Sequence, residues 1–131
     1  MSLNKLAKSL EGKLYHDKTM RTLYATDASA YRELPLAVAI PATQEDIRKL
    51  ILYAKEHGES IIPRAAGTSL AGQVVGKGIV VDISQHFNSI LSVNPQEKTV
   101  WVQPGVVRDE LNAYLHSYHL FFGPETSTSN R

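Results

Sequence analysis

A glycine-rich segment near the middle of the chain has the composition of an anion-binding loop. It reads PRAAGTSLAG, residues 63–72, and follows the aliphatic stretch SIIP. A run of small residues lets successive main-chain N–H groups approach an anion closely, and the hydroxyls of Thr68 and Ser69 add donors, a combination suited to a diphosphate. The same glycines could instead serve only as turn residues in a long connection, and the pattern alone leaves both interpretations open.

Two well-known phosphate-binding motifs are excluded for this loop. A Walker A loop requires Lys and then Ser or Thr after its second glycine, but Gln73 follows Gly72, and Lys77 is followed by Gly78. A dinucleotide-binding fingerprint requires a third glycine where Val81 stands, followed by a helix, whereas the segment IVVDIS is typical of a strand. If the loop binds phosphate, it therefore does so through its main chain rather than through a lysine.

Other residues that could do chemistry have weaker signals. Arg64 could pair with a phosphate or with a carboxylate such as Asp82, and Trp101 is interpreted as a core residue. None of the histidines has a second ligand at metal-binding spacing, so they are predicted to be surface or capping residues. They are His16, His57, His86, His116 and His119. The chain has no cysteine, which excludes disulfides, thiolate metal sites and cysteine nucleophiles.

The elements before and after the loop predict a parallel strand-helix-strand unit. LAVAIP at residues 36–41 is the first strand, and a helix begins at Thr43, whose spacing to Asp46 resembles a capping box, and ends at Gly58. SIIP and IVVDIS are the strands that follow. The order strand, helix, strand fits a parallel βαβ unit with the glycine-rich loop at the end of a strand.

Elements at the two ends of the chain complete an α/β pattern. Leucines at positions 3, 6, 10 and 14 predict a short amphipathic helix, and LYATDASAYRELP predicts a loop. Two alternating runs around Asn94-Pro95-Gln96-Glu97 predict a hairpin, and VVRDELNAYLHSYHL predicts a last helix. The ending LFFGPETSTSNR passes from a strand-like stretch into Ser and Thr, so we expect a truncated piece of a longer protein.

Composition points away from nucleic acid and from membranes. The 131 residues carry 14 Lys and Arg against 13 Asp and Glu, a formal net charge of +1, with no basic stripe among the aromatic residues. No segment has the length and apolarity of a membrane span or the pattern of a signal peptide. We therefore expect a soluble, cytoplasmic protein.

Four segments in order resemble one known family. They are AVAIPATQEDIRKLILYAKEHG, IIPRAAGTSLAGQ, GIVVDISQHFNSI and TVWVQPGVVRDELNAYL. They resemble the FAD-binding domain of the p-cresol methylhydroxylase and vanillyl-alcohol oxidase family, and are most similar to the flavin subunits of D-lactate dehydrogenase and glycolate oxidase. The resemblance implies an α+β (α/β) fold, the N-terminal subdomain of the p-cresol methylhydroxylase type, with a βαβ unit, a small parallel or mixed sheet, a β-hairpin and flanking helices. Residues 1–19 would be an N-terminal helix and lead-in, and residues 20–131 the N-terminal part of the FAD-binding domain, without its C-terminal part or a substrate domain.

The resemblance also implies which residues contact FAD. The loop would wrap the pyrophosphate, largely through main-chain donors, with Pro63, Arg64, Ala65, Ala66, Gly67, Thr68, Ser69, Leu70, Gly72 and Gln73. Gly105 would lie in a turn beside the flavin, and Pro124, Glu125 and Thr126, within GPETST, would reach the ring region. Some relatives carry a flavin-linked histidine near the position of Thr68 and Ser69, so non-covalent FAD is expected here.

As a function, the resemblance implies a flavin-dependent oxidoreductase that oxidises a 2-hydroxy acid of the D-lactate or glycolate type by hydride transfer to FAD. No residue of this chain is a candidate for the catalytic base, and the chain alone would be inactive. The alternatives are another oxidoreductase of the same flavin family, such as an alditol oxidase or a UDP-N-acetylmuramate reductase, and a non-catalytic nucleotide-binding module. Expected partners are FAD, a small 2-hydroxy acid and an iron–sulfur electron-acceptor subunit or domain.

Overall fold

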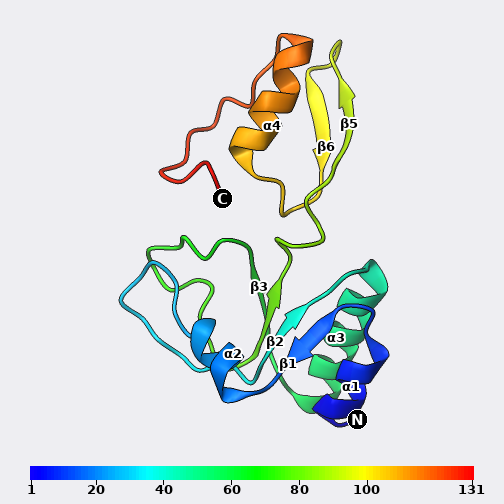
Figure 1. Ribbon diagram of the computed structural model, residues 1–131, viewed down its shortest axis with the longest axis vertical. Helices are drawn as coiled ribbons and strands as arrows, with labels where there is room; N and C mark the ends of the chain where they lie inside the picture. Colours follow the sequence, from blue (N-terminus) through cyan, green and yellow to red (C-terminus); the bar gives the residue numbers. More distant parts are fainter. The chain divides into compact units, whose positions relative to one another are not determined.

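The computed structural model describes residues 1–131, which form two compact units, Met1–His86 and Phe87–Arg131 (Figure 1). None of the helices is long and apolar enough to cross a membrane.

The first unit is built on a four-stranded mixed sheet. Its strands are β1 (Lys13–Tyr15), β2 (Ala37–Ile40), β3 (Ile61–Arg64) and β4 (Ile79–Asp82), in the order β1-β2-β4-β3. β1 pairs with β2 in the antiparallel sense, whereas β2, β4 and β3 are parallel. Pro63 lies in the edge strand β3, where a residue without an N–H donor is tolerated.

Helix α3 (Gln44–His57) connects β2 to β3 and confirms the predicted βαβ unit. The Thr43 side chain accepts a hydrogen bond from the Asp46 N–H, which caps the start of the helix. Gly58 ends it in the left-handed conformation, at φ 68°. β4 follows β3 in sequence but lies between β2 and β3, so the glycine-rich connection returns the chain to the middle of the sheet.

The core of this unit lies between one face of the sheet and the helices α1 (Leu3–Ser9) and α3. Leu6 and Leu50 are fully buried and pack with Tyr53 against side chains of the two central strands. The strand members of this cluster are Ala37, Ala39, Ile79 and Val81. Burying one leucine side chain stabilises a fold by about 2 kcal/mol, so this cluster holds the strands that carry the loop.

The prediction of a helix from residue 3 to residue 14 is wrong in its second half. α1 ends at Ser9, and Leu14 lies in β1, where it pairs with Ala39. Gly12 lies between the two elements. A Cβ at this position would lie only 2.7 Å from the Ala42 N atom, so the close approach of the two segments requires glycine. A short helix α2 (Lys18–Leu23), capped by Asp17, was also not predicted.

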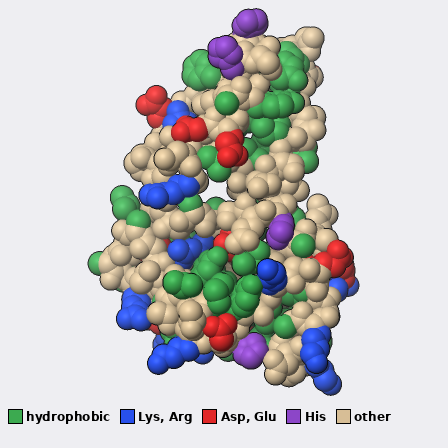
Figure 2. Space-filling model, viewed as in Figure 1, with side chains coloured by type: hydrophobic (Ala, Val, Ile, Leu, Met, Phe, Trp, Pro, Cys, Tyr) green, Lys and Arg blue, Asp and Glu red, His purple; other side chains and the backbone are tan.

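The second unit contains a β-hairpin and a helix. The strands β5 (Ile90–Asn94) and β6 (Thr99–Val102) confirm the predicted hairpin, and the Asn94 carboxamide accepts hydrogen bonds from the N–H groups of the turn. Helix α4 (Arg108–Leu115) and the 3₁₀ turn η1 (His116–Tyr118) are shorter than the predicted last helix, and no strand forms at residues 120–122. Hydrophobic side chains gather over the hairpin in Figure 2. Trp101 of β6 is 71% exposed, so its interpretation as a core residue is wrong.

Candidate functional site

The glycine-rich loop leaves the sheet at the carboxyl end of β3 and returns to it at the start of β4. Its first residues therefore lie at the edge of the sheet where parallel strands end, next to Asp82, which pairs with Arg64 in register. Ligands of α/β proteins commonly bind outside this edge of a parallel sheet. In Figure 1 this loop lies beside the segment that follows α2, and the Ala28 N–H donates to the Gly67 carbonyl at 3.1 Å.

The loop presents main-chain N–H groups that no other group of the chain uses. The N–H groups of residues 66–70 donate to no acceptor within the chain. Gly67 and Gly72 have φ values of 68° and 72°, which only glycine adopts without strain. Because the side chains of residues 66–69 are small and much of the loop is exposed, an anion such as a diphosphate can approach these N–H groups.

The two hydroxyls of the loop differ in availability. Ser69 Oγ donates to the Gln73 carboxamide oxygen and accepts from the N–H groups of Ala71, at 3.3 Å, and Gln73, at 3.1 Å. Its one proton is therefore used inside the loop. The exposed Thr68 hydroxyl has no partner in the chain. Of the two donors considered from the sequence, Thr68 is the free one.

Arg64 makes hydrogen bonds to main-chain carbonyls rather than an ion pair. Its Nη1 donates to the carbonyl oxygens of Thr26, at 2.7 Å, and Tyr24, at 3.4 Å, and its Cζ lies 5.1 Å from the centre of the Tyr24 ring. The ion pair with Asp82 considered from the sequence does not form.

Asp82 is instead held by Tyr24 and Ser84. The Tyr24 hydroxyl donates to Asp82 Oδ2 at 2.6 Å, and the hydroxyl and N–H of Ser84 donate to Oδ1 at 2.6 and 2.9 Å. Burial, together with the hydrogen bond to Asp82, raises the pKa of Tyr24 to about 12. Sequence reasoning missed Tyr24, because its partner lies 58 positions away and no local pattern indicates the contact.

The remaining predicted site residues belong to the second unit. Gly105 is buried in a turn and donates its N–H to the Phe87 carbonyl at 2.7 Å. Pro124, Glu125 and Thr126 are exposed and irregular, and the Thr126 hydroxyl donates to the Thr128 carbonyl at 2.6 Å. The predicted residues of the loop thus lie together in the first unit. Gly105, Pro124, Glu125 and Thr126 belong to the second unit.

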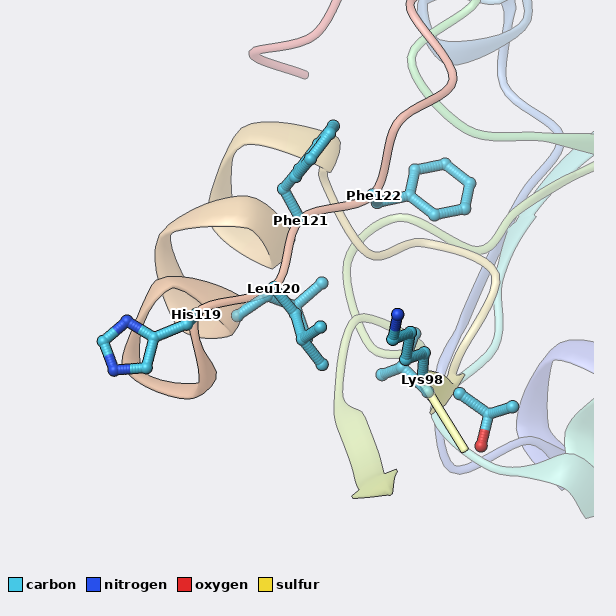
Figure 3. A pocket seen from close by; sticks show the side chains of 8 residues that line it. Lys98, His119, Leu120, Phe121 and Phe122 are labelled. Atoms are coloured by element: carbon cyan, nitrogen blue, oxygen red, sulfur yellow. The ribbon is translucent and has the colours of Figure 1, made fainter. Parts of the chain in front are cut away.

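A half-open cavity of about 370 Å³ lies within the second unit. Leu120, Phe121, Phe122 and Lys98 surround it, and the His119 imidazole points away from Lys98 (Figure 3). None of the residues predicted to bind FAD lines this cavity. No group of three or more His, Cys, Asp or Glu side chains could hold a metal ion.

Solved structures define the class of fold. An alkyldihydroxyacetonephosphate synthase superimposes with a TM-score of 0.76 at 21% identity, covering 89% of this chain and 24% of that one. A p-cresol methylhydroxylase superimposes with a TM-score of 0.69 at 18% identity, covering 82% of this chain and 22% of that one. The chain has the p-cresol methylhydroxylase type of fold, as the sequence predicted.

The particular family follows from the sequence match. Residues 35–131 match the family model described as FAD binding domain, and the chain belongs to this family. FAD is therefore its cofactor, and an array of N–H groups without acceptors in the chain fits the diphosphate of FAD.

Curated relatives are similar over most of this chain. A D-2-hydroxyglutarate dehydrogenase from Pseudomonas putida is 43% identical over 123 residues, and one from Escherichia coli K12 is 45% identical over 114 residues. The glycolate oxidase subunit GlcD of Bacillus subtilis is 33% identical over 110 residues. These alignments cover 92%, 85% and 82% of this chain but only 12%, 11% and 23% of the respective relatives.

Proposed function

We propose that the glycine-rich loop binds the diphosphate of FAD in a flavin-dependent oxidoreductase that oxidises a 2-hydroxy acid. The free N–H groups of residues 66–70, open at the carboxyl end of β3, carry this proposal. Residues 63–70, Gly72 and Gln73 would form the loop around the diphosphate. Gly105, Pro124, Glu125 and Thr126 stay proposed contacts of the flavin end.

The relatives support the choice of substrate class. Two are named for D-2-hydroxyglutarate and one for glycolate, and both compounds carry a hydroxyl on the carbon next to a carboxylate. We propose this class for the whole protein and include D-2-hydroxyglutarate beside the D-lactate and glycolate predicted from the sequence. Bound FAD supplies a ring that accepts a hydride from the hydroxyl-bearing carbon.

This chain contributes binding rather than bond-breaking. The N–H array and the Thr68 hydroxyl hold the diphosphate, and hydrogen bonds of this kind to a charged group contribute about 1.5–3 kcal/mol each. No side chain of the loop is placed to take the substrate proton, so the base is proposed to lie outside this chain. The chain alone would accordingly show no turnover.

The test is the flavin content and the activity of the native protein. Purified native protein should be yellow, heat or acid should release FAD because the attachment is non-covalent, and D-2-hydroxyglutarate, D-lactate or glycolate should bleach the flavin under anaerobic conditions. A colourless protein that does not take up added FAD would contradict flavin binding. A yellow protein that none of the three acids reduces would contradict only the substrate class.

Two further sequence predictions stay predictions. An iron–sulfur subunit or domain as electron acceptor would show as characteristic absorbance and iron in the purified protein. A cytoplasmic location would show as recovery of the native protein in the cytosolic fraction of its host.

A further inference from the structure

Residues 24–31, here called the clamp segment, hold the glycine-rich loop at several separate positions. The Ala28 N–H donates to the Gly67 carbonyl, and carbonyls of the segment accept from Arg64. The Tyr31 ring packs against Gly72, where a Cβ would lie 2.8 Å from Tyr31 Cδ2. None of these contacts uses the N–H groups of residues 66–70, so the loop is fixed while its anion-binding face stays open.

Asp27 closes a turn inside the clamp segment, where its Oδ1 accepts from the Ser29 N–H at 2.9 Å. Its pKa is held below its usual range, first by the hydrogen bond from the Ser29 side chain and then by the main-chain N–H groups of Ser29 and Val74. The Tyr31 ring contacts Gly72, so the clamp segment touches both ends of the loop. Asp27 is an ionised acceptor within the clamp segment.

Arg64 is the side chain that joins the clamp segment to the start of the loop. Its guanidinium donates to two carbonyls of the segment and lies over the Tyr24 ring. On its other side it contacts Gly67, where a Cβ would overlap Nη2 of the guanidinium. The absence of a side chain at Gly67 thus makes room for Arg64 as well as for a ligand.

Given the proposed function, we propose that Arg64 is a positioning residue for the FAD diphosphate and not a phosphate ligand. It holds the loop in the shape that exposes the N–H groups of residues 66–70. Its Nη1 is bound to the Thr26 carbonyl at 2.7 Å and its plane lies over the Tyr24 ring, so the guanidinium is held by the clamp segment before any ligand is bound. A planar fork that donates and stacks at once is a property of arginine that lysine lacks.

Substitutions at Arg64 separate the two roles in the native protein. Arg64→Met removes both fork and charge, and Arg64→Lys keeps the charge alone. If Arg64 positions the loop, both variants should weaken FAD binding by a similar factor, about ten- to a hundredfold. The dissociation constant is measured by fluorescence titration of FAD-depleted protein. Arg48→Met is the matched control, because Arg48 lies on the exposed side of α3 and pairs only with Glu45.

If Arg64 instead bound a phosphate of FAD directly, the two variants would behave differently from each other. Arg64→Lys would then keep near-normal affinity, with Arg64→Met alone defective and its binding less sensitive to salt, because a phosphate contact responds to charge. That outcome would overturn the proposal.

A second measurement needs no FAD. In FAD-depleted protein, hydrogen exchange at the Ala28 amide reports the contact between the clamp segment and the loop. Both Arg64 variants should exchange this amide at least tenfold faster, and Arg48→Met should not change it. Unchanged exchange in the Arg64 variants would overturn the proposal even if FAD binding is lost. If the protein bound no FAD at all, the proposed function would fail, and this measurement would still decide whether Arg64 shapes the loop.

A double-mutant cycle tests whether the guanidinium keeps its place when FAD is bound. Gly67→Ala and Arg64→Ala should together weaken FAD binding by less than the product of their separate factors, because removing the guanidinium relieves the overlap with the new Cβ. A multiplicative result would show that the guanidinium has left Gly67 in the complex, against the proposal.

Discussion

Two parts of the first unit gather several main-chain N–H groups, and only one of these two sets has its acceptor within the chain. At the start of α3, the buried carboxylate of Asp46 accepts from the N–H groups of Glu11 at 2.9 Å, Gly12 at 2.8 Å and Ala42 at 3.0 Å. In the glycine-rich loop, the N–H groups of residues 66–70 have no acceptor in the chain.

Asp46 is a structural anion site, whereas the glycine-rich loop is the proposed ligand site. Burial would raise the pKa of Asp46, but the surrounding N–H donors outweigh it and lower that pKa overall, so the carboxylate stays charged and joins three segments of the fold. Unpaired N–H groups in a core would be costly, whereas those of an exposed loop can be satisfied by solvent or by a bound anion. A filled N–H cradle therefore stabilises the protein, and an open one is available for binding.

The largest effect is expected from placing a carboxylate in the open cradle. Gly67→Asp should abolish flavin retention, by a factor of about 100 or more in affinity, because the carboxylate repels the diphosphate and the Cβ overlaps Arg64. The flavin absorbance per protein after desalting is the measurement.

The matched control is Gly58→Asp. Gly58 has the same φ of 68°, but a Cβ there meets nothing within 4 Å. This variant should lose about 1 kcal/mol of stability from backbone strain and keep its flavin. Equal flavin loss in both variants would mean that strain, and not the position in the loop, is responsible.

At the Asp46 site we expect a loss of stability without a loss of flavin binding, the opposite of the result at Gly67. Asp46→Asn should lower the free energy of unfolding by about 2–3 kcal/mol, because charged hydrogen bonds are lost and an amide NH₂ faces N–H donors. Folded Asp46→Asn protein should still bind FAD. Urea unfolding measures the first effect and flavin titration the second. Asp17→Asn is the control, since asparagine caps the short α2 as well as aspartate does.

The ionisation of Asp46 makes the stability of the wild-type protein depend on pH, and Asp46→Asn should remove this dependence. The folded-state pKa of Asp46 is depressed, so its stabilisation is complete above the unfolded-state pKa of about 4 and is lost as pH falls through the folded-state value. Wild-type protein should lose stability more steeply than Asp46→Asn below about pH 4. Parallel curves for the two proteins would contradict the role assigned to Asp46.

Local signals in the sequence were sufficient to predict much of the fold. Thr43 and Gly58 cap α3 as their types and positions predict, and the aliphatic run of β4 and the Asn94 turn lie where the pattern placed them. β1 was missed, because it has only three residues and Leu14 continues a helical spacing of leucines. Its strand conformation depends on pairing with β2, about 25 positions away in the sequence, and propensity does not report such long-range pairing.

In the candidate site, too, local composition was informative, whereas contacts between residues distant in the sequence were not predicted. Loop composition alone indicated an N–H cradle, but it did not separate Thr68 from Ser69 or identify the partner of Arg64. That partner lies 38 positions earlier and is a main-chain carbonyl, which any residue type supplies. The clamp segment was accordingly predicted only as a loop.

The smallest expected effect distinguishes the two hydroxyls of the open cradle. Thr68→Val preserves shape and removes a hydroxyl that has no partner in the chain, so it should leave the unfolding free energy within about 0.5 kcal/mol of wild type. FAD affinity should fall about tenfold, the lower limit for the loss of one hydrogen bond to a charged group. Ser69→Ala should lower the unfolding free energy of FAD-depleted protein by about 1 kcal/mol, because it removes hydrogen bonds that close the loop onto Gln73. If Thr68→Val bound FAD normally while Ser69→Ala lost affinity without losing stability, Ser69 would be the hydroxyl that turns to the diphosphate, and the free-donor assignment to Thr68 would be wrong.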